Sequence, residues 1–183
     1  MSKTVNNPPA LIAQETPCWC FAAAEQMARA YYQLPALSQY AIARDSVVRL
    51  AAAMDPQIFE PWFLAVATDE SAPTPPSHDE QGGANVLNSS RVQVVRSKYG
   101  VINMQAIGAH IEPAYTQQDF RTDIDNQKIV IIGTTLHFLV VYGYDDTSGF
   151  DLLVRDPSTY APRASIPYED FIRFPARVIL SFR

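Results

Sequence analysis

Four apolar runs of strand length occupy the last third of this 183-residue chain. β-branched and aromatic residues dominate these runs, as is typical of strands. The segment DDTSG (145–149) predicts a hairpin turn between the second run and the third. These features predict an antiparallel sheet in this part of the chain. The four runs are KIVIIGT (128–134), LHFLVVYGYDD (136–146), FDLLVRD (150–156) and ARVILSF (176–182).

The earlier part of the chain carries helical spacing instead. Apolar residues recur at helical intervals from Cys20 to about Gln33, and Leu34-Pro35 ends that run. The segment 38–54 predicts a second helix with Ser38 as its N-cap. Helices followed by strands indicate an α+β fold, with the helices packed on an antiparallel sheet. Shorter or less regular helices are predicted at 56–67, 91–100 and 116–127. Residues 1–13 are predicted to form an extended lead-in before the first helix.

Composition limits the class of protein. A length of 183 residues, with 48% apolar and 18% charged residues, predicts a single globular domain over 1–183. A net charge of −5 without a basic block argues against a nucleic-acid partner. We expect no membrane span and no classical signal peptide, and hence a cytoplasmic location in the producing cell. The segment 68–90, rich in Pro, Ser, Asp, Glu and Gly, predicts a long surface loop.

Two cysteines flank Trp19 at the start of the first helix. A disulfide between Cys18 and Cys20 would close a very small ring of poor geometry, and too few neighbouring ligands exist for zinc. Two buried, packed cysteines are the simplest alternative. Cys20, however, is expected in the first turn of the helix, where unsatisfied N–H groups and the helix dipole stabilise a thiolate.

A reactive thiolate needs a base, a group that orients the base, and donors for an oxyanion. His137 begins the most apolar strand, and Asp156 ends the next one. If these strands pair as a hairpin, the two side chains become neighbours and can share a hydrogen bond. Gln14, six residues before Cys20, could donate its side-chain amide to an oxyanion beside the helix N-terminus.

At these positions the sequence resembles papain-like cysteine peptidases. The segment QETPCWCFAAAEQM (14–27) looks like their active-site segment, in which Gln precedes the nucleophile by six residues. The similarity is greatest to bacterial effector and toxin proteases and to the leader peptidases that cut after a double glycine. The segments HFLVVYGYD and LLVRDP resemble the second half of the site. Phe21, where Trp is usual, and the additional Cys18 depart from the family pattern.

The resemblance implies a papain-like fold and a thiol hydrolase that needs no metal or organic cofactor. It assigns Cys20 as nucleophile, His137 as general base and acid, Asp156 as the orienting group and Gln14 as oxyanion donor. It also suggests a specific protein substrate in a target cell, delivery by a specialised secretion system and a cognate immunity protein. Transglutaminase-like transfer, deamidation, leader cleavage and a non-catalytic binding module are the alternatives.

Other side chains have two interpretations each. Trp19 could border the substrate cleft or wedge the lead-in against the core. Asp145 and Asp146 could replace Asp156, although their place in the turn suits loop formation better. His78 and His110 are expected at the surface.

Overall fold

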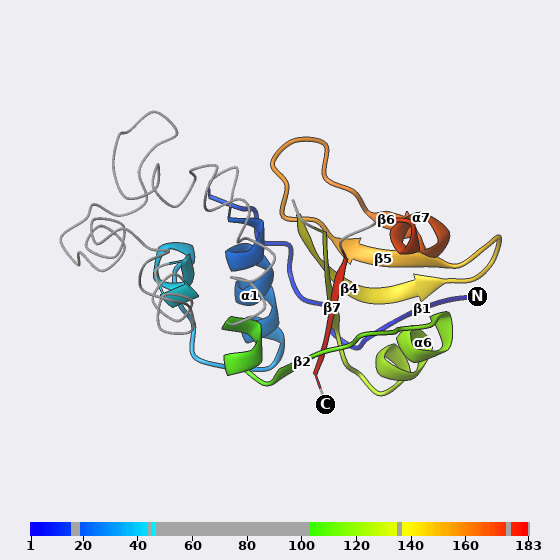
Figure 1. Cartoon of the computed structure of the whole chain (residues 1–183), viewed down its shortest axis with the longest axis horizontal. Helices are drawn as coiled ribbons and strands as arrows, with labels where there is room; N and C mark the ends of the chain where they lie inside the picture. Colours follow the sequence, from blue (N-terminus) through cyan, green and yellow to red (C-terminus); the bar gives the residue numbers. More distant parts are fainter. Residues whose placement is uncertain (16–18, 44, 47–102, 135–136, 175–176, 183) are drawn as a thin grey trace.

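A seven-stranded antiparallel sheet forms the centre of the fold (Figure 1). The computed structural model describes residues 1–15, 19–43, 45–46, 103–134, 137–174 and 177–182. The strands run in the order β2-β7-β3-β4-β5-β6, and β1 also pairs with β4. Their bounds are β1 Ser2–Thr4, β2 Ala109–Ile111, β3 Val130–Gly133, β4 Phe138–Asp145, β5 Asp151–Arg155, β6 Ser165–Pro167 and β7 Val178–Phe182.

Three helices have defined bounds, and α1 is the longest of these. α1 (Cys20–Tyr31) packs on β4, and its alanine-rich sequence suits a helix whose residues 20–25 are all buried. It ends where Gln33 adopts a left-handed φ of 55°. α6 (Gln117–Asp125) begins with a capping box between Thr116 and Asp119, and α7 (Tyr168–Ile172) follows β6. In Figure 1 α1 lies to the left of the sheet, and α6 and α7 lie to the right.

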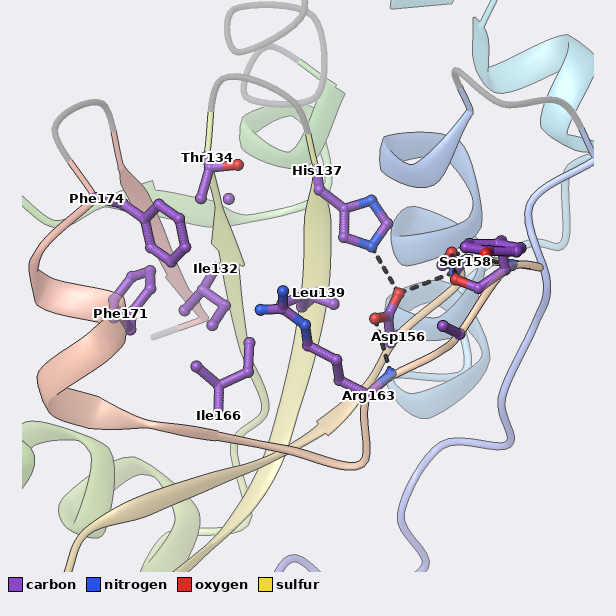
Figure 2. Close-up of a pocket in the computed structure, with 13 residues that line it drawn as sticks. Ile132, Thr134, His137, Leu139, Asp156, Ser158, Arg163, Ile166, Phe171 and Phe174 are labelled. Atoms are coloured by element: carbon purple, nitrogen blue, oxygen red, sulfur yellow. Dashed lines mark hydrogen bonds and ion pairs between the residues drawn. The ribbon is translucent and has the colours of Figure 1, made fainter.

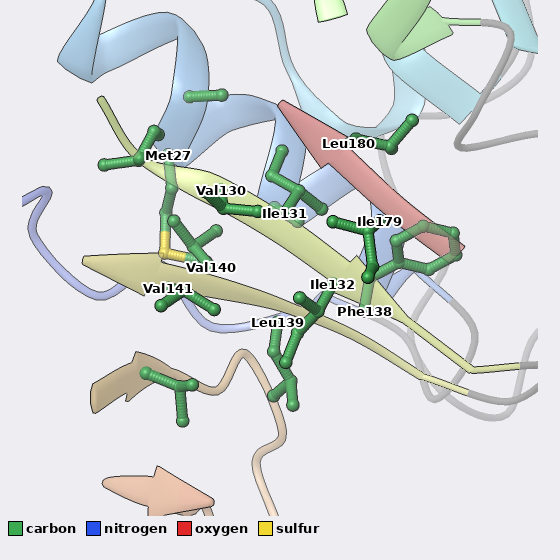
Figure 3. Close-up of a cluster of buried hydrophobic side chains, with 14 of the residues drawn as sticks. Met27, Val130, Ile131, Ile132, Phe138, Leu139, Val140, Val141, Ile179 and Leu180 are labelled. Carbon is green, nitrogen blue, oxygen red and sulfur yellow. The ribbon is translucent and has the colours of Figure 1, made fainter. Parts of the chain in front are cut away.

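The core lies around β3 and β4. All four residues of β3 are buried, which explains why its sequence is continuously apolar instead of alternating. Met27 of α1, which is fully buried, lies close to Val130 and Val140 (Figure 3). Ile132 and Leu139, also buried, line a pocket between β3, β4 and α7. Burial of both faces makes these two strands the most constrained part of the fold.

The structure agrees with the predicted α+β class and with most predicted elements that it describes. The four strand runs, the hairpin at 145–149 and the helices at 20–33 and 116–127 are all present. Ser38 caps a helical segment as predicted, since its Oγ accepts from Ala41 N–H at 3.1 Å. The predictions at 56–67, 68–90 and 91–100, together with residues 44 and 47–54 of the second predicted helix, lie outside the described residues.

Three strands were not predicted, and each is only three residues long. β1 lies in the lead-in, β2 contains His110, and β6 precedes α7. Each has only one strand partner among the described residues. These three strands therefore form because their backbones pair with a neighbouring strand, which any sequence can do. Their side chains carry little strand pattern. In the described part of the chain no helix is long and apolar enough to cross a membrane.

A close backbone approach at Gly143 provides a stability test. A Cβ at this position would lie 2.6 Å from the Lys3 carbonyl oxygen and 2.9 Å from the Thr4 side chain, so β1 would have to shift. We expect Gly143→Ala to lower the free energy of unfolding by about 1–3 kcal/mol in urea titration. Gly149→Ala is the matched control, because a Cβ there has nothing within 4 Å. Equal stability of the two variants would contradict the close packing of β1 on β4.

Candidate active site

His137 and Asp156 lie side by side at one end of the β4–β5 hairpin. His137 immediately precedes β4, and Asp156 immediately follows β5. The register Val140↔Arg155 brings the start of one strand beside the end of the other. His137 Nε2 lies 2.6 Å from Asp156 Oδ1 (Figure 2). His137 and Asp156 are therefore neighbours, as expected from the sequence, and their proximity follows directly from antiparallel pairing.

Asp156 is a buried carboxylate with a complete set of donors. Only 4% of its side chain is exposed. Besides His137, it accepts hydrogen bonds from the backbone N–H groups of Ser158 and Arg163, both at 2.9 Å. Burial alone would raise the pKa of Asp156, but these hydrogen bonds hold it below its ordinary value. The carboxylate therefore stays ionised, and it also fixes the loop that follows β5.

Cys20 is the first residue of α1 and is 2% exposed. The first turn of the helix contains no acidic residue, so nothing there opposes a negative charge. The first N–H groups of a helix lack partners within the helix and favour an anion. A thiolate at this position would therefore be stabilised by the backbone of α1.

His137 interacts with both acidic partners. Its burial disfavours the charged ring, but hydrogen bonds to Asp156 and Cys20, together with their negative charges, raise the pKa of His137 to about 9. Nε2 is already engaged by Asp156, so Nδ1 is the nitrogen left to face the Cys20 sulfur. Transfer of the thiol proton to the ring would give a thiolate–imidazolium pair.

Gln14 approaches the site from the N-terminal segment. Its backbone N–H donates to the Pro157 carbonyl at 2.8 Å, directly after Asp156. The same segment is fixed earlier in the chain, where Arg155 Nε donates to the Pro9 carbonyl at 2.9 Å. Gln14 is partly buried. The four residues predicted from the sequence thus come from four separate segments. Side-chain interactions join His137 to Asp156 and Cys20, and a backbone hydrogen bond joins Gln14 to Pro157, the residue after Asp156.

A pocket of about 400 Å³ adjoins His137 and Asp156. Its floor is apolar and buried, and Ile166 and Phe171 lie there at 3% and 1% exposure. Tyr160 and Phe174 line the same pocket and are exposed. Figure 2 shows Phe171 and Phe174 on the α7 side and the His137–Asp156 pair on the other side. The pocket can accept a large apolar group close to the candidate catalytic pair.

The remaining candidates take other roles or lie outside the described residues. Trp19 is fully buried and packs against Tyr40 with ring centroids 6.2 Å apart, so its indole belongs to the core and offers no surface to a substrate. Asp145 accepts from Thr147, and Asp146 pairs with Arg121 at 3.3 Å, so both serve the turn and its neighbours. His110 is exposed on β2, while Cys18 and His78 are not among the described residues.

Sequence reasoning missed the two backbone donors to Asp156, although one of them left a signal. Ser158 follows Asp156 by two residues, which is the spacing of a turn closed by an aspartate side chain. Arg163 is seven residues away, and no local pattern indicates its N–H as a donor. Within the described ranges, no three His, Cys, Asp or Glu side chains gather in a way that could hold a metal ion.

Comparisons with known proteins give one structural likeness. No protein-family model matches the sequence, and no curated protein matches it significantly. Among solved structures, the chain is similar to the peptidase domain of Streptococcus ComA, a bifunctional ABC transporter involved in a quorum-sensing pathway. The TM-score is 0.47 at 13% identity, over 94% of this chain and 98% of that one. A likeness at this level decides neither the family nor the function.

The raised pKa of His137 can be measured directly. In a histidine NMR titration, we expect the wild-type His137 resonance to titrate near pH 9 and that of Cys20→Ala to titrate at lower pH, because a hydrogen bond and a negative charge are lost. Asp145→Asn is the control, since Asp145 interacts with the turn. Identical titration of His137 in wild type and Cys20→Ala would show that the thiol does not interact with the ring.

The same shift predicts a pH dependence of stability. The pKa of His137 is higher in the folded chain than its ordinary value of 6.5. The stabilisation is therefore complete below about pH 6.5, and it is lost as the pH rises through about 9. We expect the wild-type free energy of unfolding to fall across this range more steeply than that of His137→Asn. Parallel urea titrations at several pH values test this, and equal slopes would contradict it.

Proposed function

We propose that this chain is a papain-like cysteine peptidase that uses Cys20, His137 and Asp156 to cleave peptide bonds. The observation that carries the proposal is that His137 interacts with Cys20 and Asp156 at once, while Cys20 begins a helix. A buried thiol, a histidine of raised pKa and a buried carboxylate in this order match the needs of nucleophilic catalysis. A packed structural cysteine would need neither partner.

The proposed reaction starts from the thiolate–imidazolium pair. The Cys20 sulfur attacks a peptide carbonyl carbon, a C–S bond forms, and the carbonyl oxygen becomes an oxyanion. The Gln14 side-chain amide and the Cys20 backbone N–H donate to that oxyanion. His137 then gives its proton to the leaving amine as the C–N bond breaks, and a thioester and a new N-terminus remain.

Water completes the cycle. His137, now neutral, takes a proton from a water molecule that attacks the thioester carbonyl. The C–S bond breaks, a carboxylic acid leaves, and the thiolate–imidazolium pair is restored. Throughout the cycle Asp156 holds the ring through Nε2, which keeps Nδ1 directed toward the sulfur. This chemistry uses only side chains of the protein and water.

The pocket supports a peptide substrate with a large apolar side chain close to the scissile bond. It adjoins His137, its floor is apolar, and it is large enough for a leucine or phenylalanine side chain. Burial of such a side chain supplies roughly 1.5–3 kcal/mol of binding. The particular target protein, delivery into another cell and a cognate immunity protein remain predictions from the resemblance.

Replacement of the nucleophile tests the reaction. We expect Cys20→Ala to fold normally by circular dichroism and to abolish the new protein N-termini that the wild type produces in expressing cells, as measured by terminal proteomics. Cys18→Ala is the matched control and should keep the cleavage. New termini at wild-type levels with Cys20→Ala would refute the proposal. Side-chain mass changes that depend on Cys20, without new termini, would indicate the deamidase or transferase alternative instead.

A second experiment tests the pocket. A peptide library made from a digested proteome should yield cleavage sites that share a large apolar residue at one fixed position. Phe174→Asp places a charge at the pocket mouth and should lower kcat/KM for these peptides roughly tenfold or more. Phe174→Leu is the control and keeps an apolar mouth. Alkylation of Cys20 by iodoacetamide should not change. If Phe174→Asp cleaved the same sites at the wild-type rate, the pocket would not bind substrate.

A further inference from the structure

The side chain of Gln39 bridges the backbone on both sides of Gln14. Gln39 is 1% exposed. Its Oε1 accepts from Glu15 N–H at 2.8 Å, and its Nε2 donates to the Ala13 carbonyl at 2.8 Å. The amide cannot be turned around, because Glu15 N–H needs an acceptor and the Ala13 carbonyl needs a donor. One buried side chain thus holds the residue before and the residue after Gln14.

A second contact holds Gln14 itself. Its N–H donates to the Pro157 carbonyl at 2.8 Å, which ties it to the segment that begins with Asp156. The backbone at this point is therefore fixed by Gln39 through the two flanking residues and by Pro157 through Gln14. A short segment held by three hydrogen bonds has little freedom to move its middle side chain.

Gln39 also connects this segment to the helix that carries Cys20. Its Nε2 makes a further hydrogen bond at 3.1 Å to Gln26 Oε1, and Gln26 lies on α1. The Gln26 Nε2 in turn donates to the Leu37 carbonyl at 2.7 Å. The buried Gln39 amide and the partly buried Gln26 amide therefore join the backbone beside Gln14, the helix α1 and the segment before Gln39.

From these contacts we propose that Gln39 is a positioning residue that sets where the Gln14 amide lies relative to Cys20. The inference rests on the proposed function, in which Gln14 donates to the oxyanion. Such a donor acts only when it lies about 2.7–3.1 Å from the oxyanion, and a misplacement of about 1 Å can cost roughly a hundredfold in rate. Gln39 acts through Gln14 and touches no reacting atom.

Two reactions of Cys20 separate positioning from general stability. Acylation by p-nitrophenyl acetate passes through an oxyanion, whereas alkylation by iodoacetamide does not. We expect Gln39→Leu, which keeps the side-chain volume, to slow acylation about tenfold or more. Its alkylation rate should stay within about twofold, because the thiolate–imidazolium pair is untouched. Rates are corrected with Cys20→Ala, and labels are located by mass spectrometry. Equal slowing of both reactions would overturn the inference.

A double-mutant cycle with Gln14 gives the sharper result. Gln14→Ala alone should slow acylation about 100-fold. In that background, Gln39→Leu should add less than about twofold, since there is no amide left to position. The same slowing by Gln39→Leu in both backgrounds would overturn the inference. If Gln14→Ala were acylated at the wild-type rate, the oxyanion role of Gln14 in the proposed function would be refuted instead.

Two further variants guard against misfolding and indirect effects. If Gln39→Leu fails to fold by circular dichroism, Gln39→Glu keeps the acceptor for Glu15 but at neutral pH loses the donor to Ala13. It should slow acylation selectively, and equal slowing of alkylation would overturn the inference. Gln26→Leu removes the bond to α1 but leaves both backbone bonds of Gln39, so it should slow acylation less than Gln39→Leu does and keep alkylation within about twofold. Slowing of acylation by Gln26→Leu equal to that of Gln39→Leu would overturn it too.

Discussion

Strand β4 determines how the other elements are placed. It pairs with β1, β3 and β5, and it also contacts α1 and α6. A strand buried on both faces and paired on both sides has one register, because a shift of one residue would exchange the side chains that pack on its two faces. His137 precedes β4 directly, so the most constrained strand also fixes the candidate base.

The buried charge of Asp156 couples the site to its surroundings. A carboxylate that is 4% exposed requires hydrogen bonds, and it receives them from His137 and from two N–H groups of the following loop. That loop carries Tyr160 and Arg163, which line the adjoining pocket. The residue that orients the imidazole therefore also shapes the surface beside it. A change at Asp156 would affect both the proposed catalysis and the proposed binding of substrate.

The elements with strong local patterns were predicted correctly, and those without were not. The runs around β3, β4, β5 and β7 are rich in β-branched residues, and α1 and α6 have helical spacing, so their type is encoded locally. The strands β1, β2 and β6 exist because a neighbouring strand offers backbone partners. A pattern search cannot detect a partner that is more than 60 residues away in the sequence, as for β1 and β2.

The candidate site likewise has some features that are encoded locally and others that depend on distant segments. The sequence by itself determined the candidate residues Gln14, Cys20, His137 and Asp156, because a helix start, a hairpin and a spacing of six residues are local features. Only the tertiary structure decided that Trp19 belongs to the core, that the Arg163 N–H completes the bonding of Asp156, and that Gln39 holds the backbone around Gln14. The physical reason is that burial and hydrogen-bond partners depend on segments far apart in the chain, which come together only when the sheet and α1 pack.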